Sequence, residues 1–160
     1  MNDRRAFIGL AGAGAISLLL FGRSGQAVAR RHFAVNHSPE QWRQMLGAQR
    51  YVVLREAATE PPFSSPLLKE HRKGTFVCAG CANPLFSSAT KFESGTGWPS
   101  FWKPLGHAIV TSPDHSHMMD RTEVLCARCG GHLGHVFDDG PRPTGLRYCM
   151  NGLALKFRPA

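Results

Sequence analysis

The spacing of apolar residues changes near residue 74 of this chain of 160 residues. Upstream, apolar side chains recur at intervals of three and four from Trp42 to Leu46, which predicts a helix with one face toward a core. The preceding run Ser38-Pro39-Glu40-Gln41 has the sequence of a capping box, so the helix is expected to begin there. Gly47 predicts a stop, and residues 49–57 predict a second short helix.

Downstream of residue 74, short apolar runs alternate with Gly, Pro, Asn and Asp. The runs cover residues 75–78, 85–86, 91–92, 108–111, 123–126, 136–137, 146–150 and 153–157. This alternation of short apolar runs and turn residues is typical of an antiparallel β domain with many tight turns. Because no repeat or second domain is evident, the sequence predicts a single domain over residues 30–160. We expect it to be mostly antiparallel β with short N-terminal helices.

Composition and charge exclude one class of protein and make one class of partner unexpected. Hydrophobic residues make up 42% of the chain, which excludes a disordered protein. The formal net charge is +8, but there is no run of five or more Lys or Arg, so a nucleic-acid partner is not expected.

Residues 1–29 have the organisation of an export signal and are set apart from the fold. Arg4 and Arg5 form a charged start, residues 6–22 are uncharged and mostly apolar, and Ala27-Val28-Ala29 is a small-x-small cleavage site. The run Arg4-Arg5-Ala6-Phe7-Ile8 resembles a twin-arginine signal, which predicts a periplasmic location. The alternative is an uncleaved anchor, through which alone the chain would contact the inner membrane.

Cleavage would change the charge and the chemical surroundings of the mature chain. It would remove three arginines and one aspartate, so the charge would fall from +8 to +6. The mature chain would then meet an oxidising compartment, which makes the state of its five cysteines an open question.

Two CxxC pairs account for four of the cysteines. Cys78 and Cys81 form one pair, and Cys126 and Cys129 form the other. Two such pairs supply the four thiolates that structural zinc prefers, and a closed shell of four sulfurs leaves no position for substrate. Two disulfides and a redox-active CxxC are the alternatives. Against the latter, neither pair is followed by the helical pattern of thioredoxin-like motifs.

Cys149 is the unpaired fifth cysteine. On a strand, Arg147, Cys149 and Asn151 would share one face, and a guanidinium beside a thiol favours the nucleophilic thiolate. An inert buried cysteine is the alternative.

Two further motifs carry candidate chemistry. His132 and His135 are three residues apart, so both can serve one pocket only if the strand bulges or bends at Gly134. Trp98 lies in a glycine-containing loop, and with Phe137 it would form an apolar cage for a methyl-bearing ligand, unless these rings belong to the core.

Together these motifs resemble the type B methionine sulfoxide reductases. The matching stretches run from about Trp42 to Phe157. They include both CxxC pairs, Ser94-Gly95-x-Gly97-Trp98-Pro99-Ser100-Phe101, Arg121-Thr122-Glu123-Val124, Gly131-His132-Leu133-Gly134-His135-Val136-Phe137 and Arg147-Tyr148-Cys149-x-Asn151.

The resemblance implies a zinc-clamped β fold and reduction of the R epimer of methionine sulfoxide, in proteins or as the free residue. It implies Cys149 as nucleophile, Trp98 packed on the substrate methyl group, and Arg147 beside the nucleophile. His132, His135 and Asn151 match positions that bind the sulfoxide oxygen or a nearby water.

One position departs from part of the family. Some members carry a resolving cysteine where this chain has Thr96. With four cysteines on metal, the sulfenic acid at Cys149 is expected to be reduced by an external thiol, such as a thioredoxin-like protein. The rival interpretations are a zinc-ribbon binding module, which has no use for the Cys149 motif, and a sulfenic-acid sensor, which has none for the Trp98 loop.

Overall fold

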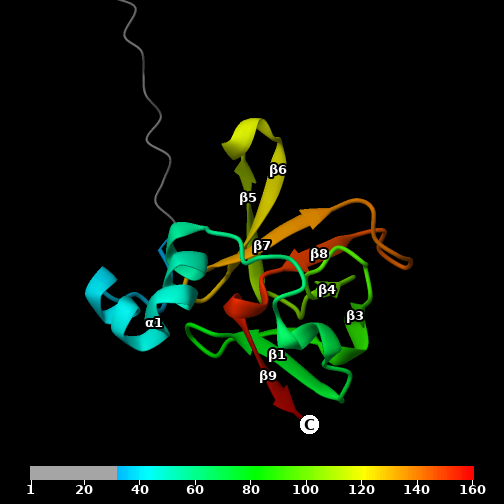
Figure 1. Ribbon diagram of the computed structural model, residues 1–160, viewed down its shortest axis with the longest axis horizontal. Helices are drawn as coiled ribbons and strands as arrows, with labels where there is room; N and C mark the ends of the chain where they lie inside the picture. The colour runs from blue at the N-terminus through cyan, green and yellow to red at the C-terminus, as the bar shows by residue number, and fades with distance from the viewer. Residues whose placement is uncertain (1–31) are drawn as a thin grey trace, which may run out of the picture. The chain divides into compact units, whose positions relative to one another are not determined.

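The computed structural model describes residues 32–160, and Figure 1 shows the helices and strands of this part of the chain. The expected export signal, residues 1–29, lies outside the described residues. Within residues 32–160, every helix is too short or too polar to cross a membrane.

Helix α1 spans Pro39–Glu56 and begins at the predicted capping box. The Ser38 side chain accepts a hydrogen bond from the Gln41 backbone, and the Gln41 side chain accepts one from the Ser38 backbone. Gly47 interrupts the helix with φ of 70° and ψ of 168°, so the two predicted helices are the two parts of one broken helix. The helix buries Trp42, Tyr51, Val53 and Leu54.

Nine strands and four short 3₁₀ turns follow α1. The strands are β1 (Gly74–Cys78), β2 (Pro84–Ser87), β3 (Lys91–Phe92), β4 (Ser100–Phe101), β5 (Ile109–Asp114), β6 (Arg121–Cys126), β7 (His132–Phe137), β8 (Arg147–Met150) and β9 (Leu155–Pro159). The 3₁₀ turns are η1 (Pro66–Lys69), η2 (Ser88–Thr90), η3 (Ser116–Met118) and η4 (Gly152–Ala154).

The strands form two antiparallel sheets. One has the order β2-β1-β9, and the other has the order β3-β4-β8-β7-β6-β5. The β5–β6 hairpin projects beyond the rest of the domain (Figure 1). Phe76, Phe86 and Phe101 pack between the sheets. The Phe86 and Phe101 rings stack with centroids 4.4 Å apart, and Phe76 meets Phe101 edge to face at 4.9 Å.

The predicted fold class, mostly antiparallel β with N-terminal helical structure, is confirmed, with one broken helix in place of the two short ones. Strand boundaries differ in places. Strand β7 begins at His132 instead of residue 136, and the predicted run 153–157 divides into η4 and β9. Strand β4 was not expected, because its two residues belong to the motif that was assigned to the glycine-containing loop.

Candidate active site and cysteine cluster

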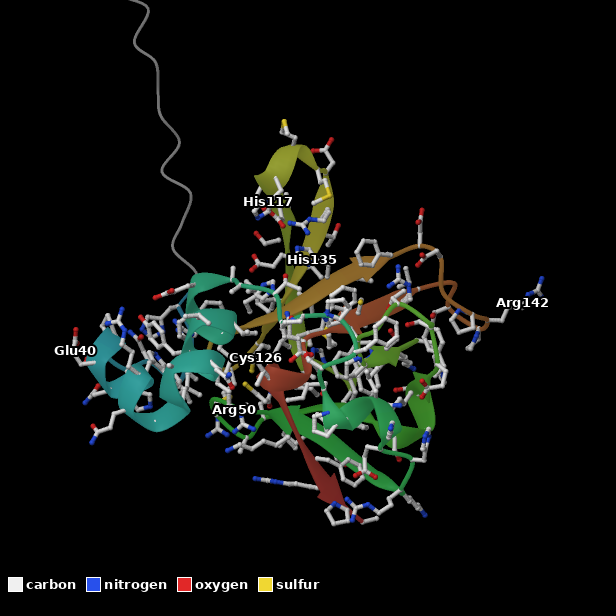
Figure 2. The ribbon with its side chains drawn as sticks, in the orientation of Figure 1. Glu40, Arg50, His117, Cys126, His135 and Arg142 are labelled. Carbon is white, nitrogen blue, oxygen red and sulfur yellow. The ribbon has the colours of Figure 1, made fainter. Side chains whose placement is uncertain are left out.

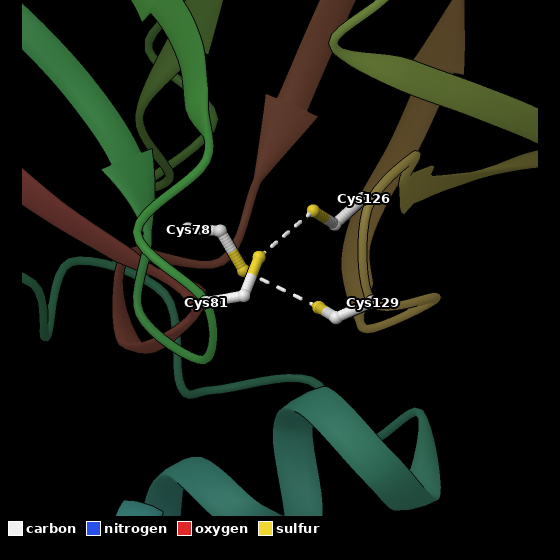
Figure 3. Close-up of side chains that lie close together, drawn as sticks. All are labelled: Cys78, Cys81, Cys126 and Cys129. Atoms are coloured by element: carbon white, nitrogen blue, oxygen red, sulfur yellow. Dashed lines mark hydrogen bonds between the residues drawn. The ribbon is translucent and has the colours of Figure 1, made fainter. Parts of the chain in front are cut away.

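The four CxxC cysteines meet where the two sheets approach each other. Cys78 and Cys81 lie at the end of β1, and Cys126 and Cys129 lie between β6 and β7 (Figure 3). All four Sγ atoms lie within 4.8 Å of one another, with 3.7 Å between Cys78 and Cys129 and 3.5 Å between Cys81 and Cys126.

This donor set fits one tetrahedral metal ion. Thiolates bound 2.3 Å from a central zinc are about 3.8 Å apart, close to the observed separations. None of the four cysteines is in a disulfide. The carbonyl of Cys129 accepts a hydrogen bond of 3.0 Å from Arg55 on α1, so the helix also fixes the second pair.

A small cavity of about 130 Å³ opens beside Cys149 on β8. Its lining comprises Thr59, Trp98, Arg121, Gly134, His135, Phe137, Cys149 and Asn151. We call it the reaction pocket. It brings together five of the seven residues predicted for the active site, while His132 and Arg147 lie behind its wall. Figure 2 shows His135 toward the β5–β6 hairpin and Cys126, of the cysteine cluster, apart from it.

Opposing influences act on the Cys149 thiol. Burial raises its pKa above the ordinary value, whereas a hydrogen bond from Thr96 and the charge of Arg147 lower it. Burial prevails, so the pKa of Cys149 is raised. The sequence-based expectation that Arg147 would favour the thiolate is right in direction but is outweighed by desolvation.

Three hydroxyl groups connect Cys149 to the glycine-containing loop. The Thr96 hydroxyl lies 3.8 Å from Cys149 Sγ and 2.8 Å from the Ser94 hydroxyl, which lies 2.7 Å from the Ser100 hydroxyl. Ser100 donates to the Trp98 carbonyl at 3.1 Å. Once Cys149 is ionised, the Thr96 hydroxyl can donate to its thiolate, and this contact lowers the pKa of Cys149.

His135 is held by a carboxylate on the β5–β6 hairpin. Its Nε2 donates to Asp114 Oδ2 at 2.7 Å, and Arg121 donates to the same oxygen at 2.7 Å. Burial lowers the pKa of His135, against the effect of Asp114. Hydrogen bonds from Ser116, followed by that from His135, hold the pKa of Asp114 well below its usual range.

His132 has a similar carboxylate partner. Its Nδ1 lies 2.7 Å from Glu123 Oε1, and its buried Nε2 has no hydrogen-bond partner among the described residues. The two imidazole rings meet edge to face, with centroids 5.4 Å apart. In each ring the carboxylate fixes one nitrogen as the donor and leaves the other able to exchange a proton.

The bulge expected near Gly134 brings the two histidines together. Gly134 pairs with Val124, but His132 pairs with Leu125, so Leu133 is the extra residue in β7. His132 and His135 thus lie opposite positions 125 and 123, which share a face of β6.

Asn151 and Trp98 are fixed by one buried segment around Glu60. The Asn151 side chain accepts from the Glu60 backbone at 3.0 Å and donates to the Leu133 carbonyl at 3.3 Å. Trp98 Nε1 donates to the Glu60 carbonyl at 3.1 Å. The Glu60 carboxylate accepts from the backbones of Gly152 and Leu153 at 2.6 and 2.8 Å.

Arg147 supports the wall of the reaction pocket. It donates twice to Asp139, at 2.8 Å each, and its guanidinium lies 4.5 Å from the centre of the Phe137 ring. Hydrogen bonds to Asp139 are the main cause that raises the pKa of Arg147.

Sequence reasoning assigned no role to the acidic partners or to the hydroxyl chain. They are Glu60, Ser94, Ser100, Asp114, Glu123 and Asp139, with Arg121 on the pocket wall. Four of them, Ser94, Ser100, Arg121 and Glu123, lie inside the motifs quoted above, and that position was their available signal. Asp114 and Asp139 lie outside those motifs, and only strand pairing and the turn after β7 bring them to the site.

Comparison with known proteins agrees with this geometry. A family model described as "SelR domain" matches residues 46–159. "Peptide methionine sulfoxide reductase MsrB" of Leptospira interrogans is 55% identical over 128 residues, which cover 79% of this chain and 98% of that protein. Its namesake of Bradyrhizobium diazoefficiens is 61% identical over 123 residues, covering 76% and 88%.

An archaeal relative extends the same result. The MsrB protein of Methanosarcina barkeri is 52% identical over 126 residues, covering 78% of this chain and 89% of its own length. The chain therefore belongs to the SelR-domain family, the oxidoreductase family of the MsrB peptide methionine sulfoxide reductases.

Proposed function

We propose that this protein reduces the R epimer of methionine sulfoxide, within proteins or as the free residue, to methionine. The observation that carries the proposal is the reaction pocket, where the Cys149 thiol lies among Trp98, Phe137 and His135. A cavity of about 130 Å³ matches the small methylsulfinyl end of the side chain. The two aromatic rings suit the methyl group, and the polar wall suits the oxygen.

The first step transfers oxygen from one sulfur to another. The Cys149 thiolate attacks the sulfoxide sulfur, which is a poor electrophile until its oxygen is protonated. His135 lines the pocket and is oriented by Asp114, so in its protonated form it is suited to donate a proton to that oxygen. The sulfur–oxygen bond of the substrate breaks, methionine leaves, and Cys149 becomes a sulfenic acid.

The second step returns Cys149 to the thiol. The other four cysteines form the cluster, so Cys149 has no partner among the described residues. An external thiol would condense with the sulfenic acid, release water and form a mixed disulfide, which a second thiol would reduce. A thioredoxin-like protein is a suitable reductant.

The cysteine cluster is proposed to hold one structural zinc ion per chain through Cys78, Cys81, Cys126 and Cys129. Its four-sulfur composition and its separations support zinc, which would fix the two sheets together. All four positions of a tetrahedral ion would be filled by protein, so the proposed reaction uses the reaction pocket alone.

Stereospecific turnover tests the proposed activity. With dithiothreitol as reductant, the protein is expected to consume the R epimer and leave the S epimer of N-acetylmethionine sulfoxide, as resolved by chiral chromatography. Cys149→Ser should abolish turnover. Consumption of S alone, or near wild-type activity in Cys149→Ser, would contradict the proposal.

We also propose export to the periplasm through residues 1–29, supported by the paired Arg4 and Arg5 and the small-x-small site at residues 27–29. There the protein would repair oxidised proteins of the cell envelope. A reporter fused to residues 1–29 should reach the periplasm, and Arg4→Lys with Arg5→Lys should block it. Export that persists without the twin-arginine translocase would contradict this route.

A further inference from the structure

A second cavity adjoins the reaction pocket. It has a volume of about 900 Å³ and is formed by the loop before η1, by η1 and by the glycine-containing loop. Trp98 lines both cavities, so its side chain forms the border between them. We call the larger one the flank groove.

The two cavities differ in size, so they would hold different parts of a protein substrate. The reaction pocket, at about 130 Å³, has room for the end of one side chain. The backbone and neighbouring residues of an oxidised protein must therefore lie outside it. The flank groove begins at the pocket's own Trp98 and has several times its volume.

Phe63 gives the flank groove an apolar surface. The side chain is 70% exposed, although its backbone is in the left-handed region with φ of 63°. Its N–H donates to the Gly97 carbonyl at 2.8 Å. A Cβ on Gly97 would lie 3.1 Å from Phe63 Cδ2 and 2.8 Å from Pro62 Cβ. An exposed ring is thus held rigidly by a conformation that most side chains avoid, a pattern associated with ligand sites.

Among the Lys, Asp and Glu side chains that line the flank groove, one lysine has no acidic partner in the described part of the chain. Glu93 forms an ion pair of 2.8 Å with Lys91, whose ammonium also donates to the Leu68 carbonyl. Lys69 is exposed, lines the groove and forms no ion pair within residues 32–160. An acidic group would find an unmatched partner there.

We propose that the flank groove binds the polypeptide segment next to a methionine sulfoxide, with an apolar residue on Phe63 and an acidic residue at Lys69. The inference rests on the proposed reductase activity and specifies its substrate class. Proteins with an apolar neighbour beside the oxidised methionine and an acidic residue farther along are preferred over proteins that lack these neighbours.

The test compares a short substrate with a long one. N-acetylmethionine R-sulfoxide fills only the reaction pocket, while a peptide with leucine beside the R-sulfoxide and glutamate beyond it also fills the groove. Phe63→Asn keeps the left-handed backbone accessible and removes the ring. We expect the ratio of kcat/KM for peptide over short substrate to fall about tenfold, the effect of losing one partly buried aromatic contact.

Two further variants complete the design. Met45→Ala removes a side chain that is 56% exposed on α1 and does not line the groove, and it should leave the ratio unchanged. Lys69→Glu alters only an exposed charge, so folding is preserved. It should lower kcat/KM for the glutamate peptide severalfold and raise it for the same peptide with lysine in place of glutamate.

The outcomes separate the two proposals. The flank-groove proposal would be wrong if Phe63→Asn left the ratio of kcat/KM for peptide over short substrate unchanged. It would also be wrong if Lys69→Glu had the wild-type kcat/KM for both peptides. Failure of the wild-type protein to reduce either substrate would instead overturn the proposed activity.

Discussion

Cys149 is a nucleophile candidate kept mainly in its protonated form. Burial raises its pKa, and only Thr96, Arg147 and Ser100 act in the opposite direction. A thiol reacts with oxidants far more slowly than a thiolate. The resting protein is therefore less exposed to wasteful oxidation, and its reactivity is expected to rise with pH as the thiolate forms.

Thr96→Val tests the hydroxyl contact. Without this hydrogen bond the pKa of Cys149 should rise further, so the midpoint of iodoacetamide alkylation against pH should move upward. At neutral pH the alkylation rate should fall roughly threefold to tenfold, as for one lost hydrogen bond. Thr111→Val, on an exposed position of β5, is the control. An unchanged midpoint in Thr96→Val would refute the role of this hydroxyl.

Thr96→Cys tests the recycling route. The Thr96 hydroxyl lies 3.8 Å from Cys149 Sγ, a short reach for a new thiol. After one turnover without reductant, the wild type should carry a sulfenic acid that dimedone labels. The variant should carry a disulfide between positions 96 and 149 and label weakly. Mass spectrometry of peptides distinguishes them, and a Cys149 disulfide to a cluster cysteine in the wild type would contradict both expectations.

At the scale of elements, β7 shows how one residue type allows a site to form. Gly134 has φ of 152°, and a Cβ there would lie 2.1 Å from the Cys149 carbonyl oxygen. Only glycine allows β8 to pair so closely at the bulge that orients both histidines.

Gly134→Ala is expected to destabilise the protein by more than about 3 kcal/mol, because backbone would have to move. The loss should appear as a lower midpoint of urea unfolding, together with lost activity. Gly106→Ala is the matched control, since a Cβ there has open space and its φ is not in the left-handed range. A change within about 0.5 kcal/mol is expected for it. Equal effects of the two substitutions would contradict this account.

The features that the sequence predicted are those determined by residues close together in the chain. The Ser38 capping box, the break at Gly47, the two CxxC pairs and the bulge near Gly134 each follow from neighbouring residues. The carboxylates behind the histidines depend on strand pairing, which places Asp114 and Glu123 there from other strands. Such long-range register leaves no local pattern, so the acidic half of the site was not predictable.

At the scale of the whole domain, two links join the sheets near the site. The cysteine cluster connects the end of β1 with the β6–β7 connection. Glu60 forms the second link, because its carboxylate holds Gly152 and Leu153 while its backbone holds Asn151 and Trp98. Loosening either link should disturb the reaction pocket from a distance.

Replacing Cys126 by Ser should lower zinc content and thermal stability together, because metal binding is coupled to folding. We expect a fall in Tm of more than about 10 °C and loss of most of the roughly one zinc per chain found by elemental analysis. Cys149→Ser, which leaves the cluster intact, should keep both. Wild-type protein with no metal and two internal disulfides would refute the site.

The pairing of β9 with β1 also sets when the protein can fold during its synthesis. Gly74 pairs with Pro159, so the first strand of the domain finds one of its partners in β9, the last strand of residues 32–160. The edge of β1 that pairs with β9 therefore stays open during synthesis until β9 has left the ribosome. A chain that ends before β9 would expose this unpaired strand edge to aggregation and proteolysis.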